Sequence, residues 1–435
     1  MRAVQRAASL FAHWATRPRR KVKAPDRARH SFRPVLEELP SRVLPAVNWI
    51  GLGGAPGNWS VADNWLDDAT GQRRIPGPND EARLEVALDG GVLNSTVNQA
   101  FTVRRLVLNN GNMTVTIADG ITLTVTEGFE HLVGTIAGAG TLKINPGGVY
   151  EWRDGAATAG TTSIEPNATL NIISANVQAR SGRTLVNKGT VNYDSAAFGL
   201  ITGGAIQNDA VGVFVIKTGA VLNDRANPGQ AKGTFTNAGL LRKPAEAQAG
   251  VSTIQVPFTN SGTIDLVAGT LKFTLDVTQT AGATNLIGGS FETTGKFTIS
   301  GGSLYGAGSV SATEVVNGGS LSMSGASAII TINGAYTQTA TGSMTLRVRG
   351  VTAGTDFDQL RVTGAAKFAG TLNTSFINFN PAATDTFDLI TFGSTDGSKF
   401  TTENLPNGWE ALYQGTKITL RKKPGGEEEG GGGVQ

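Results

Sequence analysis

Histidine and cysteine are scarce in this sequence, which limits the chemistry that the chain can perform. There is no cysteine, and the three histidines are His13, His30 and His131, of which the first two lie in one N-terminal stretch. A catalytic triad or a zinc site therefore has almost no ligands to draw on. We expect His131 in a turn or on a strand surface, and we predict no metal site and no cofactor.

Two groups of aspartates are the densest candidates for acid–base catalysis or calcium binding. One group is Asp63, Asp67 and Asp68, and the other is Asp356 and Asp358. Enzymes that cleave polysaccharides use paired carboxylates, and calcium sites use clustered ones. Capping of turns and solvation of strand edges are the more ordinary roles for aspartates in such segments. We therefore predict no catalytic residue, and a protein that is not an enzyme.

Three of the six tryptophans, Trp49, Trp59 and Trp65, fall within seventeen residues. Exposed rings would form a platform on which sugars stack, so these three residues are the candidate glycan-binding residues. Buried rings would instead supply the apolar area that the first coil of a stacked structure lacks on its open side. The Asn-Trp pairs between glycine turns favour this second reading, an N-terminal cap over residues 47–82.

Short strands joined by glycine turns are the elements that would have to position any site. Glycine accounts for 58 of 435 residues and charged residues for 16%, against averages of about 7% and about 25%. Residues 259–273, TNSGTIDLVAGTLKF, place Ile264 and Leu271 in two alternating runs on either side of a glycine turn. The same pattern of short alternating runs and glycine turns continues almost unbroken over residues 83–332, so the predicted fold class is all-β.

Asn-Gly and Asp-Gly pairs mark the expected corners in the first part of this region. They predict a strand over residues 101–108, a turn at residues 109–111 and a second strand over residues 113–117. A further strand is expected over residues 82–88, after the Asn-Asp turn that ends the cap.

Degenerate repeats distinguish two ways of arranging these strands. An Asn-x-Gly-apolar phrase recurs in residues 186–193, 236–243 and 259–266, and Asn237 and Asn260 are 23 residues apart. Solenoid units are ~20–30 residues long. One short phrase per unit favours a parallel β-helix, right-handed by the usual rule for parallel crossovers. An antiparallel sandwich or meander array is the alternative.

The positive charge of the chain lies in its first 46 residues. Residues 1–46 carry eleven Lys/Arg and three Asp/Glu, a net charge of +8, whereas the remainder carries 26 basic and 31 acidic residues, a net charge of −5. Residues 1–46 are therefore a basic leader, either removed or disordered. The acidic body argues against nucleic-acid binding. The apolar patch of residues 7–15 is too short to span a membrane, so no transmembrane segment is predicted.

Four stretches of the sequence resemble parts of secreted bacterial β-helical proteins. Residues 36–46, LEELPSRVLPA, resemble a phrase at the start of many repeat-rich bacterial surface proteins, and the Trp-rich segment resembles one that precedes their repeats. The repeats are similar to those of autotransporter-passenger and filamentous-haemagglutinin-like proteins. Residues 333–421 resemble the C-terminal module of such proteins, through matches that include Tyr336, Gln338, Phe357, Asp358, Gln359, Leu360, Val362, Gly364, Gly370, Leu372, Phe387 and Ile390.

The resemblance implies a division of the chain and a function. Residues 333–421 would form an antiparallel β-rich module that caps the β-helix, and residues 422–435 a flexible tail. The implied function is that of a non-catalytic, secreted or surface-attached structural or adhesin-like β-solenoid that contacts an extracellular ligand. The alternative is a carbohydrate-binding or polysaccharide-degrading β-helix protein.

Overall fold

The computed structural model describes most of the chain after the leader. The described residues are 46–424, except for 55–56, 86–92, 174–176, 181, 195–196, 218, 246–249 and 326. The predicted leader, apart from Ala46, and the predicted tail from residue 425 onward lie outside the described residues, as do His13 and His30.

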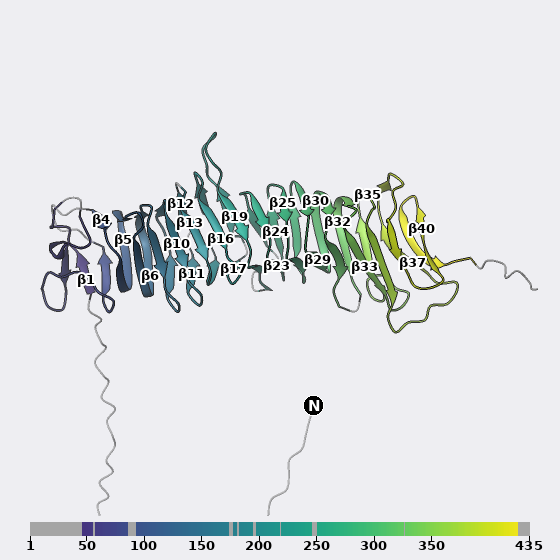
Figure 1. Cartoon of the computed structure of the whole chain (residues 1–435), viewed down its shortest axis with the longest axis horizontal. Coiled ribbons are helices and arrows are strands. Elements are labelled where there is room, and N and C mark those ends of the chain that lie inside the picture. Colours follow the sequence, from purple (N-terminus) through teal and green to yellow (C-terminus); the bar gives the residue numbers. More distant parts are fainter. Residues whose placement is uncertain are drawn as a thin grey trace, which may run out of the picture. The chain divides into compact units, whose positions relative to one another are not determined.

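The chain winds in coils of three short strands, and each strand pairs in parallel with the strand at the same position in the next coil (Figure 1). Neighbouring strands match residue for residue, as in Thr263↔Ala283 and Leu266↔Leu286. The predicted parallel β-solenoid is therefore confirmed. The antiparallel array is wrong for the repeat region, because its strands pair with the following coil rather than with their sequence neighbours.

The coils stack their strands into three faces. The first face contains β5 (Phe101–Ile117), β6 (Thr122–Ala137), β7 (Thr141–Ile144), β10 (Thr161–Ile164), β13 (Thr184–Asn187), β16 (Ala205–Asn208), β19 (Thr234–Asn237), β22 (Phe258–Asn260), β25 (Val277–Gln279), β28 (Lys296–Ile299), β30 (Gly308–Asn317), β32 (Ile329–Gln338), β35 (Ala365–Lys367) and β38 (Ser394–Thr395). The long strands pass around corners: β5 and β6 contribute to all three faces, and β30 and β32 contribute to the first and third faces.

The second face contains β1 (Ala46–Trp49), β3 (Glu81–Leu84), β8 (Val149–Trp152), β11 (Thr169–Ile172), β14 (Thr190–Tyr193), β17 (Val213–Ile216), β20 (Leu240–Lys243), β23 (Thr263–Leu266), β26 (Ala283–Leu286), β29 (Ser303–Gly306), β31 (Ser320–Met323), β33 (Ser343–Val348), β36 (Thr371–Phe376) and β39 (Thr402–Asn404). The third face contains β4 (Asn94–Val97), β9 (Ala156–Thr158), β12 (Val177–Arg180), β15 (Phe198–Ile201), β18 (Val221–Asp224), β21 (Val251–Ile254), β24 (Thr270–Phe273), β27 (Ser290–Thr293), β34 (Gln359–Val362) and β37 (Thr386–Thr391).

Alternation along each short strand builds the core. In β23 and β24 the inward residues Ile264, Leu266 and Leu271 are fully buried, whereas Asp265 and Lys272 face outward. Because successive coils are in register, each inward side chain packs on its counterpart one coil away, which gives one continuous apolar core.

The repeated Asn-x-Gly phrase forms an internal column of amides on the first face, which we call the asparagine ladder. Each asparagine amide donates to the next side chain, at 2.7 Å from Asn237 Nδ2 to Asn260 Oδ1 and 3.3 Å from Asn260 Nδ2 to Gln279 Oε1. Asn237 Nδ2 also donates to the carbonyl of Gly239, two residues later. The ladder comprises Asn187, Asn208, Asn237, Asn260 and Gln279.

The glycine of the phrase is needed for close stacking of the corners. A Cβ atom on Gly262 would lie 2.1 Å from the carbonyl oxygen of Gly239 in the preceding coil, and one on Gly282 would lie 1.8 Å from the oxygen of Gly262. Any larger residue would force the coils apart at this corner, so the phrase recurs because coils must stack there.

The first strands differ from the sequence prediction in one respect. The predicted turn at residues 109–111 does not interrupt the strand, because β5 runs from Phe101 to Ile117 and stays paired with β6, with shifts of register around Asn109. The strand predicted over residues 82–88 is β3, Glu81–Leu84, and the rest of that prediction falls mainly on residues outside the described part.

Antiparallel strands extend one face of the stack of coils at each end. At the N-terminal end β1 pairs antiparallel with β2 (Trp65–Asp67), which follows a short 3-10 helix, η1 (Ala62–Asn64). At the C-terminal end β37 pairs antiparallel with β41 (Lys417–Lys422), and β41 pairs with β40 (Trp409–Gln414).

The parallel coils continue past residue 333, where the sequence predicts the C-terminal module to begin. β33 pairs in parallel with β36, and β36 pairs in parallel with β39. The predicted antiparallel strands are present, and they form the closing hairpin of β40 and β41 rather than most of residues 333–421.

Candidate functional site

The Trp-rich segment folds into a buried cap at the N-terminal end. Trp49, Trp59 and Trp65 are all fully buried. The ring of Trp65 meets the other two edge-on, with centroids 5.0 Å from Trp49 and 4.6 Å from Trp59, and its Nε1 donates to the carbonyl of Trp59 at 2.9 Å. The stacking platform considered for glycans requires exposed rings, so these residues do not provide it in this structure.

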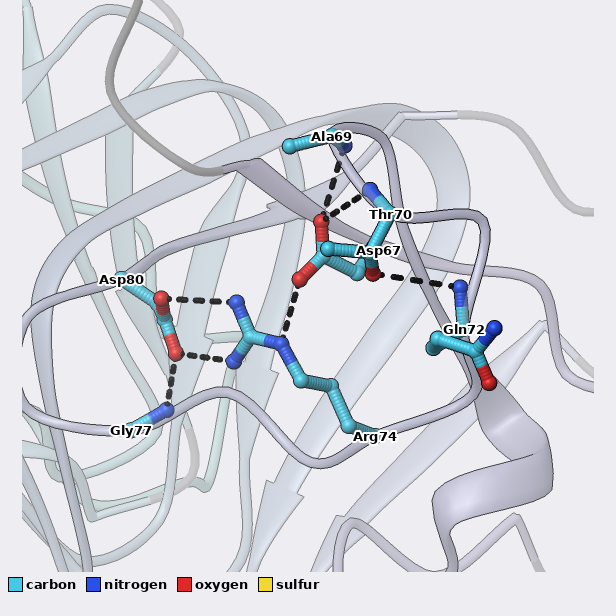
Figure 2. A network of polar contacts seen from close by, with 7 residues as sticks. All are labelled: Asp67, Ala69, Thr70, Gln72, Arg74, Gly77 and Asp80. Carbon is cyan, nitrogen blue, oxygen red and sulfur yellow. Dashed lines mark hydrogen bonds and ion pairs between the residues drawn. The ribbon is translucent and has the colours of Figure 1, made fainter.

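An arginine joins two of the aspartates that follow the tryptophans (Figure 2). Arg74 donates through Nε to Asp67 at 2.5 Å and through Nη1 and Nη2 to Asp80 at 2.5 and 2.9 Å. Asp67 also accepts the backbone N–H groups of Ala69 and Thr70, and the Arg74 hydrogen bond is the main cause that lowers its pKa. Both carboxylates are saturated with donors and stabilise the loop rather than remain available for acid–base chemistry.

The other sequence candidates of this group are engaged at the surface. Asp68 accepts a hydrogen bond from the side-chain amide of Asn48 on β1. The backbone carbonyl of Asp63 accepts a hydrogen bond from Arg73 at 2.7 Å. The three aspartates are close in sequence, but the carboxylates of Asp67 and Asp68 bond to different partners and Asp63 accepts through its main chain.

The second pair of aspartates also supports a loop. Asp358 is fully buried and accepts hydrogen bonds from Arg347 Nε at 2.8 Å and from the backbone N–H groups of Arg347 and Ala328 at 3.0 Å each. Asp356 accepts the backbone N–H of Thr352 at 3.0 Å. Asp358 therefore fixes the start of β32 to β33, and its carboxylate has no surface exposed to a substrate.

His131 lies inside the solenoid, and the prediction of a turn or a strand surface is wrong. On β6 it shares the inward side with Phe129, and its ring stacks on Trp152 of the next coil with centroids 5.7 Å apart. The carbonyl of Gly134 can only accept, so Nε2 donates to it at 3.1 Å and Nδ1 accepts from the hydroxyl of Tyr150 at 3.0 Å. Burial lowers the pKa of His131 to about 4, so the ring is neutral.

Two buried cations were not singled out by the sequence. Arg183 donates to Thr162 Oγ1 and to the carbonyl of Ala159, and burial lowers its pKa to about 10. Lys243 occupies an inward position of β20 and donates from Nζ to Ser252 Oγ at 3.0 Å. The alternation of β20 at Lys243, and that of β13 continued back by one residue to Arg183, is the only sequence signal that these side chains point inward. Both are buried, so neither has access to a substrate.

Two open grooves lie outside all of these residues. One, of about 510 Å³, follows the corner between the third and first faces at β22 and β25. The other, also of about 510 Å³, crosses the closing strands β37 and β41 and contains Asp388 and Lys417. Neither is lined by a tryptophan or aspartate that the sequence singled out. Outward threonines in strands carry no distinctive sequence signal, which is why these grooves were not predicted.

Comparison with known proteins adds no family: no protein-family model matches the sequence, and no curated protein matches it. Within the described ranges, no helix is long and apolar enough to cross a membrane. In the same part of the chain, no group of three or more His, Cys, Asp or Glu side chains is placed to hold a metal ion. What is established is the class of architecture, a parallel β-solenoid with antiparallel strands at both ends.

Proposed function

We propose that the protein is a non-catalytic structural or adhesin-like β-solenoid that acts outside the cell or at its surface. The observation that carries the proposal is that those candidate catalytic carboxylates that are buried are bonded to arginines. Asp67 is held by Arg74, and Asp358 is held by Arg347. Because these buried polar side chains are bonded within the protein, they stabilise the fold and are not available to a substrate. This favours a stiff support for surface contacts over a catalyst.

The similarity of the repeats to autotransporter-passenger and filamentous-haemagglutinin-like proteins supports the same proposal. A stack of coils in register resists bending because each coil is bonded to its neighbours along three faces. Loops at the corners then present contacts repeatedly along the stack, and many weak contacts give avidity to a distant ligand. The antiparallel strands cover one strand edge at each end and so limit edge-to-edge pairing between copies there.

The location is tested by recovering the protein from cell-surface, culture-medium and cytoplasmic fractions and sequencing its N-terminus. We expect the surface or medium fraction to hold the chain, with its first residue near Ala46, because the basic leader precedes the folded part. A chain confined to the cytoplasm and starting at Met1 would contradict the proposal.

The alternative is a carbohydrate-binding or polysaccharide-degrading β-helix. The open groove at β22 and β25 is the observation that favours binding, since clefts of 300–1,000 Å³ suit small ligands. An assay for new reducing ends on a panel of polysaccharides separates the scaffold from the polysaccharide-degrading form of this alternative. Release of reducing ends by the purified chain, but not by a heat-denatured control, would replace the scaffold proposal with an enzyme.

A further inference from the structure

The groove at β22 and β25 is built from three successive coils. Its lining comes from the outer side of the first face and from the corner that precedes it, and comprises Pro257, Phe258, Thr259, Thr274, Leu275, Asp276, Thr278, Thr294 and Gly295. The equivalent corner residues recur once per coil, so the groove runs along the direction in which the coils stack, at a spacing of roughly 4.8 Å.

The groove is lined by two threonines, Thr259 and Thr278, of a column that continues beyond it to Thr298. Thr259 is in register with Thr278, and Thr278 with Thr298, on the outward side of β22, β25 and β28. Within the described part of the chain, the hydroxyls of these three residues make no hydrogen bond to another protein group. They are therefore donors and acceptors that a ligand along the coils can use.

A second column of hydroxyls, directly after the ends of β25 and β28, behaves differently. Thr280 Oγ1 donates to the carbonyl of Asn260 at 3.3 Å, and Ser300 Oγ donates to that of Gln279 at 3.1 Å. These hydroxyls are turned back onto the preceding coil. The hydroxyls of these coils thus divide into one column that supports the coils and one that is open to the groove.

The rim of the groove holds a carboxylate in a fixed position. Asp276 is exposed, and its Oδ1 accepts the backbone N–H of Lys296 at 2.8 Å. A Cβ atom on Gly295 would lie 2.1 Å from that oxygen, so glycine at this position is what allows the carboxylate to lie across the corner. Oδ2 is left to accept from a ligand.

The charge of the groove restricts the ligand. Among the described residues that line it, Asp276 is the single charged one. The nearest lysine, Lys296, is paired with Glu314 at 2.8 Å. An anionic chain would bring further negative charge against the Asp276 carboxylate, whereas a ligand rich in hydroxyl donors could donate to it. Pro257 and Leu275 add apolar rim surface against which the C–H faces of a sugar ring can pack.

From this arrangement we propose that the groove binds an uncharged glycan chain laid along the coils, with its hydroxyls on Thr259 and Thr278 and one hydroxyl donated to Asp276. The inference rests on the proposed function, since it names the ligand class of a surface-contacting solenoid. A polymer whose hydroxyls repeat with each ring matches a column whose hydroxyls repeat with each coil.

The test is calorimetric titration of the full chain with cellohexaose, chitohexaose and hexagalacturonate. We expect binding of an uncharged hexasaccharide and weaker or no binding of hexagalacturonate. Thr259→Val/Thr278→Val keeps the side-chain shape, and Asp276→Asn removes the charge, so each is expected to weaken binding about tenfold. Thr280→Val/Ser300→Ala is the matched control in the same coils and should leave affinity unchanged.

Three results would overturn the groove as a glycan site. They are no binding of either uncharged probe, tighter binding of hexagalacturonate, and equal loss in the groove and control variants with native circular dichroism. Each leaves the proposed function standing if the chain is still recovered from the cell surface. Recovery only from the cytoplasm would instead remove the proposed function, whatever the calorimetry shows.

Discussion

At the scale of the residue, the interior of this solenoid is notable for its polar side chains. Asparagines of the ladder lie in the core beside leucines, and burying an amide is costly unless its donors and acceptors are paired. Here each amide bonds to the next coil and to a nearby carbonyl, as Asn237 does with Asn260 and Gly239. The ladder therefore fixes the register of the coils as well as contributing to stability.

We predict that Asn237→Ala lowers the free energy of unfolding by roughly 1–3 kcal/mol, because it leaves the amides of Asn208 and Asn260 each with one partner fewer. Chemical denaturation measures the change. The control is Asn285→Ala, whose outward amide bonds only to Asp265 among the described groups. Equal losses in the two variants would show that the ladder is no more important than a surface hydrogen bond.

His131 makes stability depend on pH in a defined direction. Burial lowers the pKa of its imidazole to about 4 in the folded chain, against about 6.5 when unfolded. Between these values only the unfolded state binds the proton, so the free energy of unfolding falls as pH is lowered from about 6.5 to about 4, by at most about 1.4 kcal/mol per unit. Below pH 4 this contribution no longer changes.

The measurement is denaturation of the wild type and of His131→Phe across that range. Phenylalanine retains the stack on Trp152 but cannot be protonated, so the variant should be less sensitive to pH between 6.5 and 4. It should also be less stable at neutral pH, because the Tyr150 hydroxyl loses its acceptor. Parallel pH profiles would mean that His131 does not control acid stability.

At the scale of the element, each strand is too short to be stable alone and depends on its neighbours in the adjacent coils. β24 contributes four residues, of which Leu271 lies between Ser252 and Phe291 of the neighbouring coils. Its outward neighbour Lys272 pairs with Glu292 at 2.6 Å on the surface. Inward and outward positions of one strand therefore have different energetic importance.

We predict that Leu271→Ala costs about 2–5 kcal/mol of stability, because a buried leucine is replaced by a cavity. Lys272→Ala is the control on the same strand and should cost no more than about 1 kcal/mol, since surface ion pairs contribute little. A denaturation midpoint unchanged by Leu271→Ala would contradict its place in the core.

The loop that follows the three tryptophans within the N-terminal cap depends on Arg74. Replacing it in Arg74→Met leaves Asp67 and Asp80 without their shared cation, and we expect a loss of about 1–3 kcal/mol, because Arg74 is partly exposed and its charge is screened. Arg153→Met removes an exposed pair with Glu151 and should cost less than about 1 kcal/mol. Limited proteolysis would locate the opening at residues 67–80. Cleavage elsewhere, or none, would argue against this role.

At the scale of the whole stack of coils, the exposed edges of the end coils are the main hazard. An unpaired strand edge recruits another chain, and here the hairpin of β40 and β41 covers β37 through antiparallel pairing. Trp409 of this hairpin packs on Phe376 with ring centroids 4.8 Å apart, which attaches the hairpin to the last coils.

Removing the hairpin should therefore create a self-associating protein. A chain ending at Leu405 exposes the edge of β37, and we expect concentration-dependent oligomers by light scattering after size-exclusion chromatography. A chain ending at Pro424 keeps the hairpin and serves as the control. If the shorter chain keeps its solenoid circular dichroism and remains monomeric, the hairpin is not an edge cap.

The sequence by itself determined the class of fold and the direction of many side chains. Alternation at Ile264 and Leu271 specifies which residues enter the core, because successive side chains on a strand point to opposite sides. The spacing of Asn237 and Asn260 indicates one unit per coil. These are local signals, carried by a few adjacent residues, and so they can be recognised without the tertiary structure.

Only the tertiary structure decided what depends on contacts between coils. Trp59 is a cap residue rather than a sugar platform, because neighbouring elements cover its ring. His131 is a core residue, because Tyr150 and Gly134 satisfy its nitrogens from positions that no local pattern specifies. The groove at Thr259, Thr278 and Asp276 exists because residues about twenty positions apart are brought into register. Function on a solenoid depends on this register, which strand pairing creates.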